Sequence, residues 1–138
     1  MEIAFKTVIR IPRSTAQQRR FTSAGNHPTA GMRKAAATWQ ALFEKFSPAR
    51  PFGKGVPLQV DITLCFHGKE PLGPKVTRPD IDNLAKMMLD AMTRAGYWED
   101  DNQVASLLVA KCTYANPSDD IIIVRVSEIT ATVLLEME

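Results

Sequence analysis

The clearest pattern in the chain is an alternation of apolar and polar side chains over residues 58–66. The apolar positions are Leu58, Val60, Ile62, Leu64 and Phe66. Successive side chains of a β-strand point to opposite faces, so this period of two predicts a strand with one face against a core. Apolar runs at 3–11, 104–114 and 121–126 predict three further strands, and turn-forming residues at 116–120 make the last two a hairpin.

Two other segments have apolar residues three and four positions apart, the spacing that places side chains on one face of an α-helix. The first predicted helix covers residues 29–46, and its apolar side consists of Ala35, Trp39, Leu42, Phe43 and Phe46. The second lies between Pro79 and Gly96, with an apolar stripe of Leu84, Met87, Met88, Ala91, Met92 and Ala95. Proline is common where helices begin and glycine where they end. Whether Asp80 or Asp82 caps this helix stays open.

The element order is therefore β-α-β-α-β-β, which predicts an α+β fold with a mixed sheet and two helices packed against it. A length of 138 residues suits a single domain covering 1–138. Residues 12–28 are expected to form a polar, basic loop, and 47–57, with three prolines and two glycines, a linker within the domain. Residues 130–138 fit a strand, a helix or a tail.

Composition narrows the class of protein. Apolar residues make up 45% and charged residues 23%, as in ordinary soluble domains. No apolar run approaches the ~20 residues of a membrane span, and the first 20 residues lack the apolar core of an export signal. A cytoplasmic protein without a membrane partner is expected. Cys65 and Cys112 are then expected to be reduced, and neither has zinc-site spacing to His27 or His67.

Charge is unevenly distributed although the net charge is only +2. Residues 1–78 contain 13 basic and 4 acidic side chains, whereas 79–138 contain 4 basic and 11 acidic ones. A basic part that neutralises phosphates beside an acidic part that holds a cation suits a metal-dependent nuclease, though such polarity also arises by chance. The candidate DNA-binding residues are Arg13, Arg19, Arg20, Lys69, Lys75 and Arg78. For Lys69, Lys75 and Arg78 an ordinary solvated loop is equally plausible.

Six carboxylates are concentrated in residues 78–104, namely Asp80, Asp82, Asp90, Glu99, Asp100 and Asp101. Asp80 and Asp82 point to the same side if their backbone is extended. Mg²⁺ takes oxygen ligands, so this cluster is a candidate metal site. Singly, each acid could instead cap a helix or lie in a solvated turn. Repelling carboxylates are costly unless a cation or proton compensates them, which weakens that second interpretation for the set.

The run Arg-Pro-Asp-Ile-Asp-Asn-Leu-x-Lys, followed by Ala-Gly-Tyr-Trp and then Glu-Asp-Asp-Asn-Gln-Val, resembles the signature of the RusA family of Holliday junction resolvases. The resemblance is strongest over 78–104 and implies a small homodimeric endonuclease that resolves four-way DNA junctions in recombination and repair, using Mg²⁺. It implies catalytic aspartates, also the metal ligands, at Asp80, Asp82 and Asp101, and a catalytic lysine at Lys86. Asp100 matches a less critical acid of the family.

Carboxylate-held Mg²⁺ can activate water and stabilise the charge that develops during phosphodiester hydrolysis. Lys86 would stabilise that charge or orient the water, and one or two ions are equally compatible with the sequence. Three alternatives remain. One is a nuclease of the PD-(D/E)xK type, for which Pro79-Asp80 is present but no later Asp/Glu-x-Lys follows. The others are a noncatalytic DNA-binding module that uses the basic half, and a structural protein whose acids cap a helix.

Overall fold

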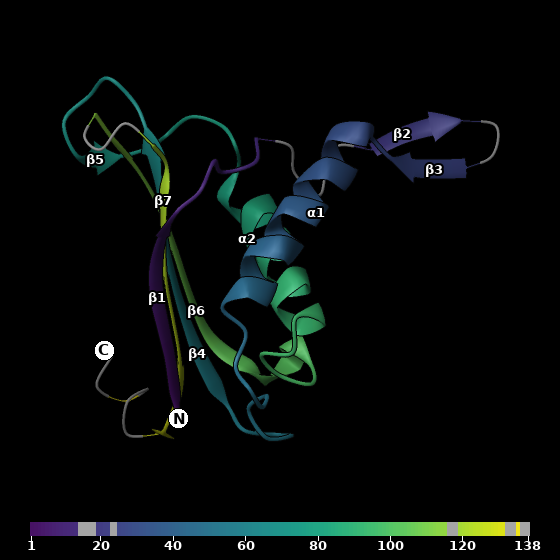
Figure 1. Cartoon of the computed structure of the whole chain (residues 1–138), viewed down its shortest axis with the longest axis vertical. Helices are drawn as coiled ribbons and strands as arrows, with labels where there is room; N and C mark the ends of the chain where they lie inside the picture. Colours follow the sequence, from purple (N-terminus) through teal and green to yellow (C-terminus); the bar gives the residue numbers. More distant parts are fainter. Residues whose placement is uncertain (14–18, 23–24, 116–118, 132–134, 136–138) are drawn as a thin grey trace.

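The fold is a five-stranded mixed sheet with two helices against one face (Figure 1). The computed structural model describes residues 1–13, 19–22, 25–115, 119–131 and 135. The sheet consists of β1 (Glu2–Val8), β4 (Leu58–His67), β5 (Gly73–Pro74), β6 (Val104–Tyr114) and β7 (Ile121–Glu128). The helices are α1 (Ala30–Lys45), α2 (Ile81–Arg94) and a short 3₁₀ helix, η1 (Asp101–Gln103). A separate hairpin pairs β2 (Arg19–Thr22) with β3 (Gly25–Pro28).

The strand order is β1-β7-β4-β6-β5, with β4 and β6 parallel and the other neighbours antiparallel. This arrangement confirms the predicted α+β fold and its mixed sheet. The predicted hairpin of 104–114 and 121–126 is wrong, because β4 lies between β6 and β7 and pairs with both of them. Two elements were not predicted from the sequence. The β2–β3 hairpin lies in the segment that was expected to be a loop, and β5 is a strand of only two residues. The first strand is also shorter than expected: it ends at Val8, after which Ile9 N still donates to the carbonyl of Asp120 at 3.0 Å.

The core lies between the helices and the face of the sheet that they cover. The five alternating apolar residues of β4 are all buried, as predicted. From the helices, α1 contributes Ala35, Trp39 and Phe43, while α2 contributes Leu84, Met87, Met88, Ala91 and Met92. Burying each large side chain contributes roughly 1.5–3 kcal/mol, so this packing holds α2 rigidly on the sheet. No described helix has the length and apolarity to cross a membrane.

The chain reverses direction directly after α2. Gly96 has a positive φ of 85°, a conformation that glycine adopts readily. Two buried aromatic residues then fix the reversal: Tyr97 Oη donates to the carbonyl of Phe43 at 2.9 Å, and Trp98 Nε1 donates to Thr93 Oγ1 at 2.7 Å. The acidic residues that follow are thereby placed beside the helix that precedes them.

Cys65 and Cys112 are free thiols, as expected, and are paired neighbours across β4 and β6. They are half-buried, because their side chains lie on the face of the sheet opposite α1 and α2. Burial, and then the neighbouring Cys65 thiol, raises the pKa of Cys112 to about 11. Cys112 is therefore a poor nucleophile at neutral pH.

Candidate active site

Asp80 and Asp82 stand at the N-terminal end of α2. Asp80 occupies the cap position with an extended backbone (φ −69°, ψ 137°), and its carbonyl accepts from Leu84 N at 3.1 Å. Its side chain makes no capping hydrogen bond. Asp82 lies in the first turn, and both residues are exposed. The carboxylate of Asp80 is therefore not used by the helix and is open to solvent, unlike that of an ordinary cap residue.

A lysine on the neighbouring strand holds the segment that leads to Asp80. Lys111 Nζ donates to the carbonyl oxygens of Thr77 and Pro79, both at 2.8 Å. In addition, Lys75 N donates to the carbonyl of Lys111 at 3.1 Å. The segment before α2 is thus tied to β6 by both side-chain and backbone hydrogen bonds.

The second acidic segment is held by the side chain of Gln103. Its Oε1 accepts from Glu99 N at 3.1 Å and Asp100 N at 3.2 Å, and its Nε2 donates to the carbonyls of Gly53 at 2.8 Å and Val56 at 3.2 Å. Asp100 Oδ1 in turn accepts from Asn102 N at 2.9 Å, which completes a capping box at the start of η1. The acidic turn is therefore an ordered structure.

Asp101 lies in this turn on the side that faces α2. Burial, and then a hydrogen bond and negative charge from Asp100 and the negative charge of Asp90, raise its pKa above the usual aspartate value. Together with Thr93, Arg94 and Glu99, these three acids line a shallow hollow of ≈360 Å³. Concentrated negative charge of this kind favours a bound proton or cation.

The structure therefore forms two acidic groups and not one. Asp80 and Asp82 are at the start of α2, whereas Asp101 lies beside Asp90. The eight residues of α2 that separate Asp82 from Asp90 span about 12 Å at the usual rise of an α-helix. Within the described part of the chain, no three His, Cys, Asp or Glu residues are grouped so that they could hold a metal ion. One chain alone does not bring Asp80, Asp82 and Asp101 together.

Lys86 lies on α2 one turn beyond Asp82 and is exposed. The described residues contain no ion pair between Lys86 and any acid, although Asp82 and Asp90 are each four residues away along the helix. Its ammonium group is therefore available to a ligand near the start of α2.

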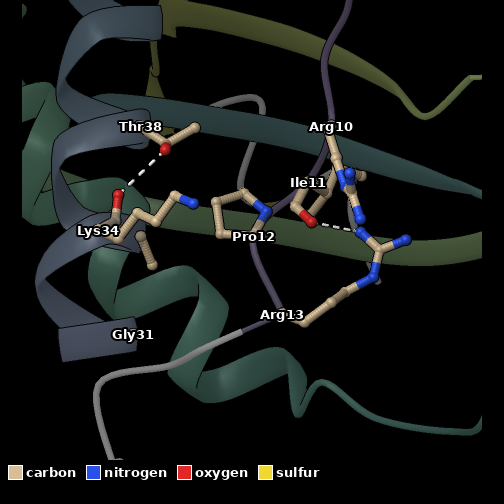
Figure 2. Close-up of a pocket in the computed structure, with 8 residues that line it drawn as sticks. Arg10, Ile11, Pro12, Arg13, Gly31, Lys34 and Thr38 are labelled. Atoms are coloured by element: carbon tan, nitrogen blue, oxygen red, sulfur yellow. Dashed lines mark hydrogen bonds between the residues drawn. The ribbon is translucent and has the colours of Figure 1, made fainter. Parts of the chain in front are cut away.

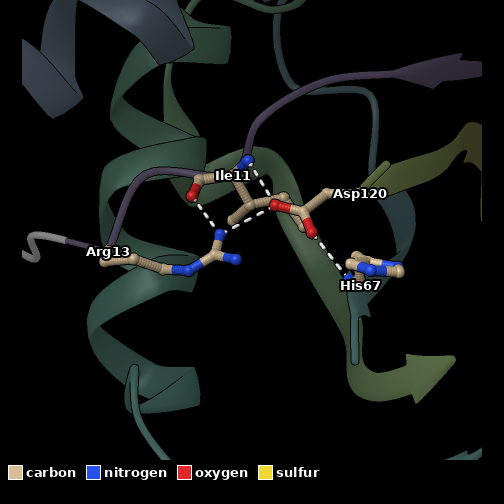
Figure 3. A network of polar contacts seen from close by, with 4 residues as sticks. All are labelled: Ile11, Arg13, His67 and Asp120. Carbon is tan, nitrogen blue, oxygen red and sulfur yellow. Dashed lines mark hydrogen bonds and ion pairs between the residues drawn. The ribbon is translucent and has the colours of Figure 1, made fainter. Parts of the chain in front are cut away.

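Arg13, predicted to contact DNA, is bonded to an acid of its own chain (Figure 3). Its Nη1 lies 2.8 Å from Asp120 Oδ2 and also donates to the carbonyl of Ile11, while its guanidinium stacks 4.7 Å from the ring centre of Phe66. Asp120 is buried and accepts two further hydrogen bonds, from Ile11 N at 2.9 Å and His67 N at 2.7 Å. Arg13 is thus partly neutralised and has a clear structural role.

The other predicted cations differ in their surroundings. Lys75 is half-buried with its Nζ 5.1 Å from the ring centre of Phe66 and 2.7 Å from Thr77 Oγ1, and burial followed by the charges of Lys111 and Arg13 lowers its pKa. Lys69 and Arg78 are exposed. The side chains of Arg19 and Arg20 lie outside the described residues.

The sequence analysis missed Lys111, Gln103 and Asp120. Lys111 had a detectable signal, because it is the single charged side chain in the strand Val-Ala-Ser-Leu-Leu-Val-Ala-Lys-Cys-Thr-Tyr. A lone charge in an apolar strand usually needs partners. Gln103 had a local signal as well, because it stands three residues after Asp100 in a capping box, but its partners Gly53 and Val56 are 50 and 47 residues away. The role of Asp120 had no local signal, since its partners His67 and Ile11 lie 53 and 109 residues away in sequence.

Comparison with known families matches residues 11–126 to the model described as Endodeoxyribonuclease RusA. The matched region contains both acidic groups, Lys86 and Lys111. This chain belongs to the RusA family. Membership agrees with the resemblance carried by residues 78–104 and assigns both acidic groups to one family domain.

Among curated relatives, a crossover junction endodeoxyribonuclease rusA of Lactococcus phage r1t is 36% identical over 75 residues, which cover 52% of this chain and 57% of the relative. The crossover junction endodeoxyribonucleases of Escherichia coli K12 and Enterobacteria phage 82 are each 50% identical over 38 residues. These two matches cover 28% of this chain and 32% of each relative. The chain thus spans between 32% and 57% of the length of these relatives.

Proposed function

We propose that this chain is a Mg²⁺-dependent endodeoxyribonuclease that resolves four-way DNA junctions by paired nicks in recombination and repair. The observation that carries the proposal is the Asp80–Asp82 pair at the start of α2, exposed and, at Asp80, unused by the helix. Mg²⁺ is commonly held by one or two carboxylates together with waters and substrate phosphates. This pair therefore suits Mg²⁺ in the presence of DNA.

Bound Mg²⁺ would supply a water of lowered pKa and positive charge opposite the phosphate oxygens. Asp80 and Asp82 would ligate the ion, and Lys86, one turn along α2, would offset negative charge on the phosphate or orient the attacking water. Asp101 is proposed as a further ligand. Because it lies at the other end of α2, this role requires that a second copy of the chain or a movement of the turn brings it to the pair.

Incubation of a labelled four-way junction, a linear duplex and a fork, each with Mg²⁺ or with chelator, tests the proposed activity. Nicks of the junction that depend on Mg²⁺ and exceed cleavage of the duplex are expected. Equal cleavage of duplex and junction would leave a nuclease but contradict junction resolution. Binding without cleavage of any substrate would favour the noncatalytic DNA-binding module.

A homodimer is part of the proposal, since a four-way junction presents two symmetry-related strands and a two-fold pair of sites matches them. The face of the sheet that neither helix covers is the proposed contact surface for the second copy. On this face Val8, Leu108 and Ile123 are 61%, 55% and 42% exposed, and Lys6 and Asp61 supply charges of both signs. An isologous contact needs such a self-complementary surface.

Light scattering of the wild type and of Ile123→Lys tests this surface. The wild type should have twice the mass of the 15.3 kDa chain, and the variant should dissociate at concentrations where the wild type does not. Lys6→Ala is the control, because it changes a side chain on the same face without introducing a charge into the proposed contact. A wild type that is monomeric while it cleaves junctions contradicts the dimer.

A further inference from the structure

The N-terminal part of the chain contains no acid for 41 residues. Between Glu2 and Glu44 there are seven basic side chains and neither Asp nor Glu. The segment builds β1, the β2–β3 hairpin and α1, and the C-terminal end of β1 and the N-terminal end of α1 lie at the end of the molecule where α2 begins (Figure 1). A segment without acids thus reaches the end of the molecule at which α2 carries Asp80 and Asp82.

Residues of this segment line a hollow of ≈430 Å³ between residues 10–13 and the first turns of α1 (Figure 2). Arg10, Arg13 and Lys34 supply its charges, and Ile11, Pro12 and Ala35 supply apolar walls. In Figure 2 the Lys34 side chain extends from α1 towards Pro12 on the opposite wall. The hollow also lies at the N-terminal end of a 16-residue helix whose first turn contains no acid. That end of a helix carries partial positive charge and favours anions.

The charges of the hollow are only partly compensated within the chain. Arg13 is bonded to Asp120. By contrast, Arg10 and Lys34 take part in no ion pair within the described residues, and the neighbouring segment 14–28 contains no acid in its sequence that could neutralise them. Uncompensated cations in a concave site raise the local concentration of anions.

We infer that this hollow binds a backbone phosphate of the DNA strand that runs to Asp80 and Asp82, with Arg10 and Lys34 as its ligands. The inference rests on the proposed function. A carboxylate pair repels the phosphates of its own substrate, and cations at the same end of the molecule offset that repulsion. Binding of phosphate in the hollow would hold the strand in register without reading its bases.

Salt-dependent binding of a four-way junction in chelator tests the hollow with the double variant Arg10→Ala/Lys34→Ala. The matched control is Lys45→Ala/Arg50→Ala, which removes the same charge from outside the hollow. The slope of log affinity against log salt should fall by about 2 for the double variant, one for each lost contact, and by less for the control.

Equal losses of slope in both variants would overturn the inference, because charge alone and not the hollow would then bind the DNA. Binding is measured without Mg²⁺, so its outcome is independent of cleavage. A wild type that binds junctions without cutting them would contradict the proposed activity and leave the test of the hollow intact.

A second observation, independent of the hollow, is the pair of hydrogen bonds from Lys111. Its ammonium group bonds the carbonyls on either side of Arg78, and the second of these belongs to Pro79, the residue directly before Asp80. The side chain is half-buried in β6, whose position is set by its parallel pairing with β4. We propose that Lys111 is a positioning residue that fixes the approach of the chain to Asp80 and so preorganises the Asp80–Asp82 pair.

Titration with Mg²⁺, followed by the amide chemical shifts of residues 80–82, tests this role without cleavage. Lys111→Met should weaken Mg²⁺ binding by about 10–100-fold, the usual cost of losing a group that orients a ligand, and Lys111→Arg should recover part of the loss. Junction affinity in chelator should change little for Lys111→Arg. The control is Lys69→Met, an exposed lysine on the preceding loop.

Identical Mg²⁺ affinities in the wild type and Lys111→Met would overturn the positioning role. A purely structural lysine would lower the melting temperature of Lys111→Met while its folded fraction bound Mg²⁺ normally. Failure of the wild type itself to bind Mg²⁺ would instead contradict the proposed function.

Discussion

Arg13 Nη1 lies 2.8 Å from Asp120 Oδ2, which ties the segment after β1 to the residue that precedes β7 (Figure 3). Asp120 also accepts from the backbone amides of Ile11 and His67, so three elements converge on one buried carboxylate. All of its partners are donors. Only an acceptor-only group satisfies them together, which explains an acid at this position.

Replacing Asp120 by Asn should lower the free energy of unfolding by about 1.5–3 kcal/mol, the usual contribution of hydrogen bonds to a charged group. The amide would present its own N–H groups to donors and would no longer neutralise Arg13. Urea unfolding of the variant measures the loss, and Asp119→Asn, an exposed neighbour, is the control with an expected change within about 0.5 kcal/mol. Equal stabilities of the two variants would show that the network contributes little.

The same carboxylate predicts how stability depends on pH. Burial alone would raise the pKa of Asp120, but hydrogen bonds from Arg13, His67 and Ile11 together hold it below the usual value of 3.8. The folded state therefore binds this proton less tightly than the unfolded chain does. The stabilisation is complete above the unfolded pKa and is lost as pH falls through the lower folded pKa. Unfolding midpoints below about pH 4 should thus fall more steeply in the wild type than in Asp120→Asn.

Gln103→Glu should destabilise the acidic turn, because a carboxylate cannot donate to the carbonyls of Gly53 and Val56. Each of these part-buried hydrogen bonds contributes about 0.5–1.5 kcal/mol. Thermal unfolding measures the effect, and Asn102→Asp makes the same chemical change at an exposed position one residue away. Comparable melting temperatures for the two variants would mean that the amide of Gln103 does not hold the turn.

Asp82→Asn should reduce single-turnover cleavage in Mg²⁺ by more than ~10²-fold, since loss of a metal ligand costs more than loss of a group that merely orients one. Asp101→Asn tests the proposed third ligand in the same way. Junction binding in chelator should persist or tighten, because each change removes a negative charge close to the phosphates. Wild-type cleavage rates in the folded Asn variants would exclude these aspartates as metal ligands.

Lys86→Ala should also slow cleavage, but it removes a positive charge and so should not tighten junction binding. Lys45→Ala is the matched control, because Lys45 lies in the last turn of α1 and belongs to neither acidic group. Equal effects of the two substitutions on cleavage and binding would indicate a general contribution of positive charge and no specific role for Lys86.

The local elements of this protein follow directly from its sequence. The alternation at 58–66 and the three-and-four spacing before Gly96 place apolar side chains on one face, and the structure buries them as the periods require. The family motif at 78–104 is likewise local, since its residues lie on one helix and the turn that follows it. Such features depend on neighbours a few residues apart, which the sequence displays.

Contacts between distant segments were decided only by the tertiary structure. Arg13, which was predicted to contact DNA, is also bonded to Asp120. Lys111 holds a segment that lies more than 30 residues away in sequence. The two acidic groups are close in sequence but are separated in space, because α2 is rigid and the chain reverses only after its last turn. Partners of this kind are set by sheet order and helix packing, which arise from many weak contacts at once and leave no periodic signal along the chain.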